Sequence, residues 1–237
     1  PYFDIDNKNG NLVMASFYDG GSSEDDPAAS GYLFASFDPA NGTPVKTTYT
    51  PFSKDFIGEL TGRENPTNLS LYTFSIRRCV LRNDGGTLIV AESFIKDTRE
   101  TVMPMGIQPG YNSYRTSEIF QFNDIVAFSV ILDGKLDWRS IMRKKQVSED
   151  DNGAYSSFLL MNEKDRLRFL YLDDVSNSAV LNEYLLYSIG KTERNTLFNQ
   201  EDRDLMLLPK MGKQISPNEV VLPSYKGNSL RLVKIIY

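Results

Sequence analysis

Carboxylates are the residues of this sequence that could do chemistry. The chain has 31 Asp and Glu residues and no histidine. Without histidine, Ser-His-Asp and Cys-His nucleophile systems and the histidine-dependent zinc motifs are excluded. Glycoside hydrolysis needs only two Asp or Glu across a cleft, so it remains. The adjacent Asp173 and Asp174 do not make such a pair, because neighbours on a strand point to opposite faces. The sequence therefore predicts no catalytic residues and no organic cofactor.

Two acidic loops carry the oxygen-rich residues that calcium prefers. They are residues 23–26 (SEDD) and residues 148–153 (SEDDNG). Because Ca²⁺ takes roughly six to eight oxygen ligands, Asp150, Asp151 and Asn152 are the candidate metal ligands. Neither loop has the alternating spacing of a known calcium loop. A solvated turn is therefore the favoured interpretation and calcium the alternative.

Four arginines and one cysteine are further candidates. Arg77, Arg78, Arg82 and Arg115 would suit the carboxylate of an acidic sugar if they converged. Strand alternation places the first two on opposite faces, which favours solvated or stacked arginines instead. Cys79 is the only cysteine, so no intrachain disulfide can form. Its place in an apolar run predicts a core residue and not a nucleophile.

The bulk composition argues against two classes of partner. The net charge is −5 and the pI is about 5.0. Such a surface lacks the basic stripe that neutralises phosphates, so no nucleic-acid partner is expected. The sequence has no run of about 18 apolar residues, so no membrane-spanning segment is expected. With 41% hydrophobic and 24% charged residues, the chain is predicted to fold around a packed core.

The elements that must position these residues are short strands. Runs of Val, Ile, Leu, Phe and Tyr alternate with Asn-Gly or Asp-Gly pairs, which suit tight hairpin turns. Similar strand pairs recur, and flanking strands extend them to four-stranded units at 1–56, 70–145, 154–200 and 204–237. Radial repetition of four-stranded antiparallel sheets is typical of propellers. We predict an all-β, β-propeller-like single domain over residues 1–237, with a β-sandwich as the alternative.

The same patterns give finer predictions. Residues 97–122 contain Pro and Gly and are predicted to form a long loop. Residues 204–211 are predicted to be the first strand of the last unit, and helix is expected only in short turns. Mid-strand apolar positions predict five core residues, namely Leu88, Val90, Phe128, Phe169 and Leu186.

The last predicted unit has only three strands. Its third strand covers residues 229–236, while residues 1–7 already serve as the first strand of the first unit. An exposed strand edge presents unpaired backbone groups that invite pairing. We therefore expect this edge to meet another chain, a segment outside this sequence, or an unusual N-terminal pairing. On the same argument the chain is expected to be the C-terminal part of a longer one.

A motif within residues 124–171 resembles a known group of proteins. It comprises Leu132-Asp-Gly-Lys-Leu-Asp-Trp138, then Lys144-Lys-Gln146, then Asp151-Asn-Gly-Ala-Tyr-Ser-Ser157, and finally Leu167-Arg-Phe-Leu-Tyr171. This order resembles uncharacterised propeller-like envelope proteins of the type found in Bacteroidota, although Ala154 departs from the usual aromatic residue or glycine. The resemblance implies a periplasmic or outer-membrane-associated location and adds no catalytic residues.

These observations give two hypotheses of function. The first is a non-catalytic envelope protein that acts as an interaction platform for another envelope protein or complex, such as an outer-membrane or secretion assembly. The second is a carbohydrate-binding or carbohydrate-active propeller that uses Asp and Glu. A purely structural repeat within a larger chain is a third interpretation.

Overall fold

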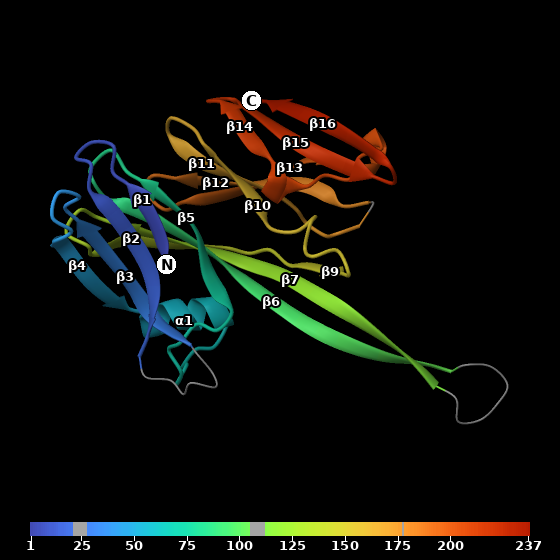
Figure 1. Cartoon of the computed structure of the whole chain (residues 1–237), viewed down its shortest axis with the longest axis horizontal. Helices are drawn as coiled ribbons and strands as arrows, with labels where there is room; N and C mark the ends of the chain where they lie inside the picture. Colours follow the sequence, from blue (N-terminus) through green and yellow to red (C-terminus); the bar gives the residue numbers. More distant parts are fainter. Residues whose placement is uncertain (21–27, 105–111, 177) are drawn as a thin grey trace. The chain divides into compact units, whose positions relative to one another are not determined.

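The computed structural model describes residues 1–20, 28–104, 112–176 and 178–237 of the chain. The fold is all-β, with 60% strand and 6% helix. Four antiparallel sheets of three to five strands are present in the described residues, and none of them is closed (Figure 1). The all-β class and the predicted excess of strand over helix are therefore confirmed.

Each sheet is an up-and-down meander whose strands follow chain order. The first sheet contains β1 (Tyr2–Ile5), β2 (Leu12–Asp19), β3 (Ala29–Phe37) and β4 (Pro44–Pro51). The second contains β5 (Phe74–Leu81), β6 (Thr87–Pro104), β7 (Asn112–Val130) and β8 (Leu136–Met142), and β9 (Gln146–Glu149) pairs with β7. The third contains β10 (Phe158–Asn162), β11 (Arg166–Leu172), β12 (Val180–Tyr187) and β13 (Thr192–Asn199).

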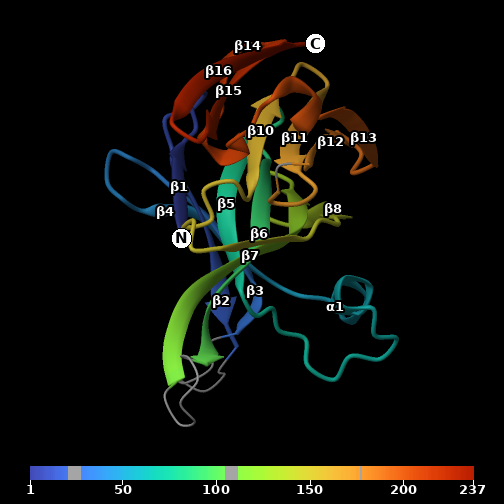
Figure 2. The same cartoon turned by 90° about the vertical axis from the view of Figure 1, so that its right-hand side faces the viewer.

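The fourth sheet, called here the C-terminal sheet, has three strands. They are β14 (Lys213–Ser216), β15 (Glu219–Lys226) and β16 (Ser229–Ile236). Figure 2 shows them in red, with the C-terminus of the chain beside them. The four sheets thus correspond to the four predicted units, including the three-stranded last one.

The chain forms two compact units. Residues 1–93 and 124–143 make the first unit, and residues 94–123 and 144–237 make the second. In each unit, two sheets pack face to face around one apolar core, as in a sandwich. The prediction of a single domain over residues 1–237 stays a prediction.

The core of the first unit is aromatic. Phe128 on β7 lies in contact with the rings of Tyr32, Phe52 and Phe56, with centroids 5.1 to 5.8 Å apart. Phe56 belongs to the helix α1 (Lys54–Thr61). This helix was not predicted from the sequence, for which helix was expected only in short turns. The signals of this helix are Ser53 as N-cap, accepting a bond from the Phe56 N–H, and Gly62 as a left-handed C-cap. Burying Phe56 and Ile57 fixes the helix on the core.

The core of the second unit is aliphatic. Leucines and Met161 of the third sheet pack against Val220 and Leu222 of β15, together with Leu205 and Leu207 from the preceding segment. The prediction of core residues is confirmed, since all five are buried, namely Leu88, Val90, Phe128, Phe169 and Leu186.

The predicted loop at residues 97–122 is wrong. Strand β6 continues to Pro104 and β7 begins at Asn112, so the described part is a long two-stranded ribbon. Residues 105–111 lie outside the described residues. Backbone pairing along the ribbon is reinforced where Lys96 pairs with Glu118 at 2.6 Å and lies over the Phe120 ring. Because both faces of the outer ribbon are polar, its sequence lacks the alternation that predicts a strand.

The predicted strand at residues 204–211 is also wrong. Leu205, Leu207 and Leu208 are buried, but Leu207 makes only an isolated bridge with Ser224, and a short 3-10 helix occupies Pro209–Met211. Proline lacks the N–H that a ladder needs, which interrupts the strand. A second 3-10 turn occupies Glu201–Arg203. In the part of the chain that is described, no helix has the length and apolar character needed to cross a membrane.

Candidate functional site

The three calcium candidates lie in the turn between β9 and β10. Asp150 accepts a bond from the Glu118 N–H at 2.8 Å and lies 3.4 Å from the Arg115 guanidinium. Asp151 Oδ1 accepts bonds from Ser148 Oγ and the Gly153 N–H, both at 2.7 Å. Protein donors therefore already occupy carboxylate oxygens that calcium would need.

The backbone of this turn is also poorly suited to hold a cation. Asn152 is exposed, and both Asp150 and Asn152 have left-handed backbone conformations, with φ of 55°. The Lys210 ammonium lies 3.5 Å from the Asn152 carbonyl oxygen, where it would repel a cation. Within the described ranges, no group of three or more His, Cys, Asp or Glu is arranged to hold a metal. Calcium binding by this turn stays a prediction, and the first acidic loop, residues 23–26, lies outside the described residues.

A groove of about 880 Å³ lies beside the turn, within the second unit. Asp151 lines it, and its second oxygen, Oδ2, has no hydrogen-bond partner in the described structure. Tyr155 also lines the groove and donates its hydroxyl to the Tyr225 carbonyl at 3.1 Å. Burial, followed by the charge of Asp151, raises the pKa of this phenol. Three further carboxylates line the groove, namely Asp97, Glu100 and Glu149.

The groove was not predicted because its wall is the ribbon of β6 and β7. Residues 97–100 belong to the stretch that was predicted to be a loop. On the same wall, β9 pairs with β7 so that Val147 lies opposite Gln121 and Glu149 lies opposite Ile119. The only sequence signal was the acidic motif that ends in Asp151.

The four arginines do not converge. Arg77 pairs with the buried Glu92 at 3.1 Å, and Arg82 pairs with Asp84 and Asp137. Arg115 belongs to the other unit and lies beside Asp150, while Arg78 is exposed. Each charge therefore has its own surroundings, and no anion site is formed from this set.

Cys79 is buried in the core of the first unit, as predicted. Burial, followed by the charge of Asp4, raises the pKa of its thiol to about 12. A thiol that stays protonated at neutral pH is a poor nucleophile.

The Lys-Lys-Gln turn of the resembling motif has a structural role. The buried Lys144 ammonium donates to the Phe122 carbonyl at 3.0 Å and to Gln146 Oε1 at 2.8 Å. Gln146 also accepts from the Ser157 N–H and donates to the Leu172 carbonyl, both at 2.8 Å. One amide thus ties the β9 strand to the start of β10 and the end of β11.

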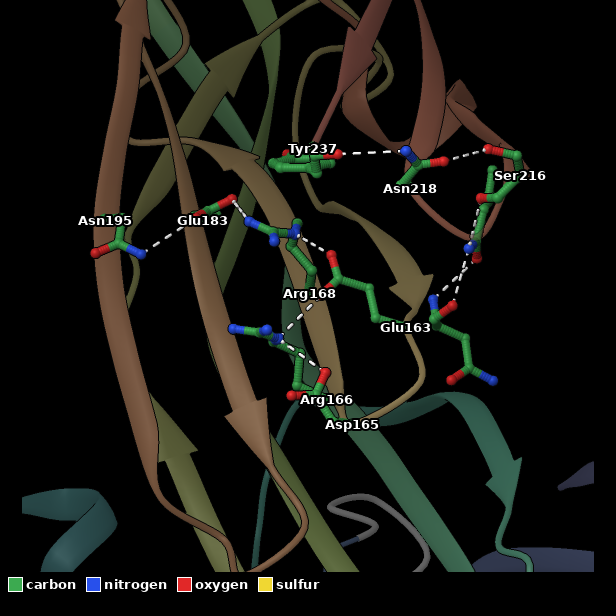
Figure 3. A network of polar contacts seen from close by, with 11 residues as sticks. Glu163, Asp165, Arg166, Arg168, Glu183, Asn195, Ser216, Asn218 and Tyr237 are labelled. Atoms are coloured by element: carbon green, nitrogen blue, oxygen red, sulfur yellow. Dashed lines mark hydrogen bonds and ion pairs between the residues drawn. The ribbon is translucent and has the colours of Figure 1, made fainter.

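A network of buried charges lies on the third sheet (Figure 3). Arg168 on β11 donates to Glu163 Oε1 at 2.7 Å and pairs with Glu183 on β12. Arg166 lies 3.0 Å from the other oxygen of Glu163, and Asn195 on β13 donates to Glu183 at 3.1 Å. Burial opposes the charge of Arg168, but its bonds to the two glutamates raise its pKa above the ordinary value.

Two carboxylates around one arginine are chemically suited to catalysis only if a substrate reaches them. The side chains of Arg168 and Glu183 are 9% and 5% exposed, and neither lines the groove. The Arg168 guanidinium instead lies 3.6 Å from the centroid of the Tyr237 ring. The backbone carbonyl of Tyr237 accepts a hydrogen bond from the side chain of Asn218. The network therefore fastens the last residue of the chain to the third sheet.

The C-terminal sheet has two unlike faces. Alternate residues of β15 and β16 pack into the core, including Val220, Leu222, Val233 and Ile235. The other face, called here the outer face, carries Leu230, Leu232 and Ile236 on β16, which are 67%, 72% and 63% exposed. Ile215 on β14 and Tyr225 on β15 are also exposed large residues. A soluble surface rarely leaves such a set of apolar side chains together without a binding role.

One ion pair interrupts the outer face. Lys234 on β16 lies 2.5 Å from Glu219 on β15. The third strand of this sheet, β16, pairs only with β15. No described strand lies on its other side. An open strand edge and an apolar outer face thus occur on the same element.

Comparisons with protein-family models, with curated proteins and with solved structures found no match for this chain.

Proposed function

We propose that this chain is a non-catalytic binding module of the cell envelope, in the periplasm or at the outer membrane. It docks a partner protein on the outer face of its C-terminal sheet. The observation that carries the proposal is the exposure of Leu230, Leu232 and Ile236 on that face. Burying side chains of this size contributes about 1.5 to 3 kcal/mol each, which is the usual driving force of protein association.

Two further features support a binding role over a catalytic one. The best-organised pair of carboxylates, Glu163 and Glu183, is used to neutralise Arg168. The envelope location is supported by the resemblance of residues 124–171 to envelope proteins. We infer that the partner is a protein of the same compartment.

Site-specific photocrosslinking tests the docking surface. A benzophenone amino acid replaces Leu232 on the outer face, and the same group replaces Lys191, which is exposed in the turn between β12 and β13, as a matched control. We expect a light-dependent adduct from position 232 and not from position 191, and its loss when Leu230→Asp is added. Equal yields at the two positions would contradict the proposal. Recovery of the adduct in the cytosolic fraction would contradict the location.

A carbohydrate ligand is the second candidate, because the groove beside Asp151 combines carboxylates with the ring of Tyr155. The hydroxyls of a sugar can donate hydrogen bonds to carboxylate oxygens, and an apolar face of the sugar ring can pack on an aromatic ring. Titration of the protein with neutral and basic oligosaccharides, followed by amide chemical shifts, tests this. Saturable shifts at Asp151 and Tyr155 that are lost in Asp151→Asn would support it, and no shifts at millimolar sugar would reject it.

A further inference from the structure

We propose that β16 receives an antiparallel strand from a partner polypeptide along its open edge. The strand has the polar, Thr-containing character of β4 and β13. This inference rests on the proposed docking function and specifies the form that docking takes, namely addition of a strand to a sheet.

The backbone of β16 is oriented for such an addition. On the neighbouring strand β15, the Pro223 carbonyl accepts from the Leu208 N–H at 2.8 Å, and the Tyr225 N–H donates to the Met206 carbonyl at 2.9 Å. These groups therefore point away from β16. Because an opposed antiparallel pair exchanges either both bonds or neither, their cross-strand partners Leu232 and Leu230 also point away from β15.

The alternation extends along the strand. Lys234 and Ile236 occupy the same backbone phase as Leu230 and Leu232, so four residues direct their N–H and C=O groups to the open edge. In the described part of the chain no strand receives these bonds. The chemical group that satisfies such a row of alternating donors and acceptors is another extended polypeptide.

The internal repeat shows what this position holds elsewhere. In the other three sheets the third strand is β3, β7 or β12, and each has an outer strand beside it. Strand β12 is buried on both faces, and so is β7 over residues 125–130. Strand β16 is likewise apolar on both faces, yet one face is exposed. Strands β3, β7 and β12 each have a neighbour on both edges, whereas β16 has one on a single edge within the described chain.

The outer strands of the repeat share a chemistry. Strands β4, β8 and β13 each follow a turn with a left-handed glycine, namely Gly42, Gly134 and Gly190. Strand β4 is rich in Thr, and β13 is rich in Thr, charged residues and Asn, as in Thr192-Glu-Arg-Asn-Thr196. Strand β8 carries Asp137, Arg139 and Ser140 among apolar residues. Polar side chains suit a strand that has only one neighbour and faces solvent on the other side. The donated strand is therefore expected to have this character.

The donor is a partner and not a described part of this chain. Every described strand already pairs within its own sheet. A second copy could offer only strands that already pair on at least one side, its own β16 among them.

Hydrogen exchange with a synthetic peptide tests the inference. The probe copies residues 190–199, which include β13, and the control peptide has proline in place of Arg194 and Asn195. Adjacent residues point to opposite edges, so one of these prolines must remove a bond to β16. With the full chain and millimolar probe, we expect amide exchange of Leu230, Leu232, Lys234 and Ile236 to slow at least about threefold. The edge strand β4 should be unaffected.

Two variants of one residue make the test specific. Leu232→Pro removes an N–H that bonds nothing within the described chain, so it should fold and lose the protection. Leu232→Thr shortens the same side chain but keeps the N–H, so the protection should remain. Thermal melting of both variants checks their folding.

Each other outcome overturns the inference. Exchange that is unchanged by the probe, or slowed equally by the control peptide, rejects strand addition. Protection in the absence of peptide that rises with protein concentration and is lost in Leu232→Pro shows pairing between copies instead. The photocrosslink from position 232 reports docking on the outer face separately. A crosslink that persists in cells without any peptide protection therefore rejects this inference alone, whereas loss of the crosslink rejects the proposed function.

Discussion

The guanidinium of Arg168 lies 3.6 Å from the centroid of the Tyr237 ring while it also bonds to Glu163 and Glu183. A strand residue of the third sheet thus contacts Tyr237, which follows β16, by a cation–π interaction, while two glutamates fix its guanidinium in place. Burial, followed by the charge of Glu183, raises the pKa of the Tyr237 phenol, so the ring stays neutral beside the carboxylates. The stability of the second unit should depend on this one side chain.

Arg168→Gln is expected to lower the free energy of unfolding by about 3 to 5 kcal/mol, because Glu183 is left buried without its cation. Arg166→Gln is the matched control. Its side chain is 31% exposed, and its loss should cost only about 0 to 1 kcal/mol. Urea denaturation monitored by circular dichroism measures both. Equal losses for the two variants would contradict the assignment.

Phe128→Ala is expected to destabilise the chain by about 3 to 5 kcal/mol, because it leaves a cavity among the rings of Tyr32, Phe52 and Phe56. Phe3→Ala removes a ring of the same size from an exposed position on β1 and is the control. Thermal unfolding of both variants distinguishes core from surface. A melting temperature of Phe128→Ala as high as that of Phe3→Ala would show that the aromatic cluster does not hold this unit together.

The thiol of Cys79 should react slowly with a disulfide reagent in the folded chain. Its pKa of about 12 leaves almost no thiolate at pH 8, and its side chain is buried. In urea the pKa returns to its ordinary range, and the reaction should become fast. Following the chromophore released by the reagent, with and without urea, measures the two rates. Rapid reaction of the folded protein would refute the burial of this residue.

Asp204 should make the C-terminal sheet sensitive to acid. Bonds from Lys226 at 2.8 Å and Arg231 at 3.1 Å hold the pKa of its carboxyl below the ordinary value of 3.8. Because the folded pKa is the lower one, the stabilisation is present above pH 3.8 and is lost as the pH falls through the folded pKa. The melting temperature of Asp204→Asn should therefore be lower than that of the wild type at pH 6, and the difference between the two should disappear in acid.

Asp202→Asn is the control for this pH effect, because it removes a carboxylate two residues away. Its melting temperature should follow the wild type at every pH. A gap between Asp204→Asn and the wild type that stays constant from pH 6 into acid would show that the two ion pairs do not contribute.

The periodicity of the sequence predicted strands in which apolar residues alternate or run continuously. Strand β16 matches its predicted range of residues 229–236 for this reason. The outer ribbon of β6 and β7 was missed because its stability comes from backbone pairing and ionic contacts such as that between Lys96 and Glu118. Residues 204–211 were misassigned because burial of Leu205 and Leu207 mimics a strand while Pro209 prevents one.

The candidate sites were predicted unevenly for a related reason. The open edge at residues 229–236 followed from counting repeat strands, which is local information. The ionic network depends on Arg168 and Glu183 meeting across two strands, and Tyr237 arriving from another sheet. Such contacts between distant residues have no signature in a single sequence. The groove beside Asp151 was missed with the ribbon that forms its wall.

The first unit is discontinuous in sequence, since residues 1–93 are completed by residues 124–143. During synthesis, its core cannot be completed until Phe128 has left the ribosome, although most of its strands have left it earlier. Until then Ile89 and Ala91 on β6 lack the strand that covers them. The nascent chain therefore passes through a stage with an exposed apolar edge, and a chaperone or slow translation after residue 93 would affect its yield more than its final stability.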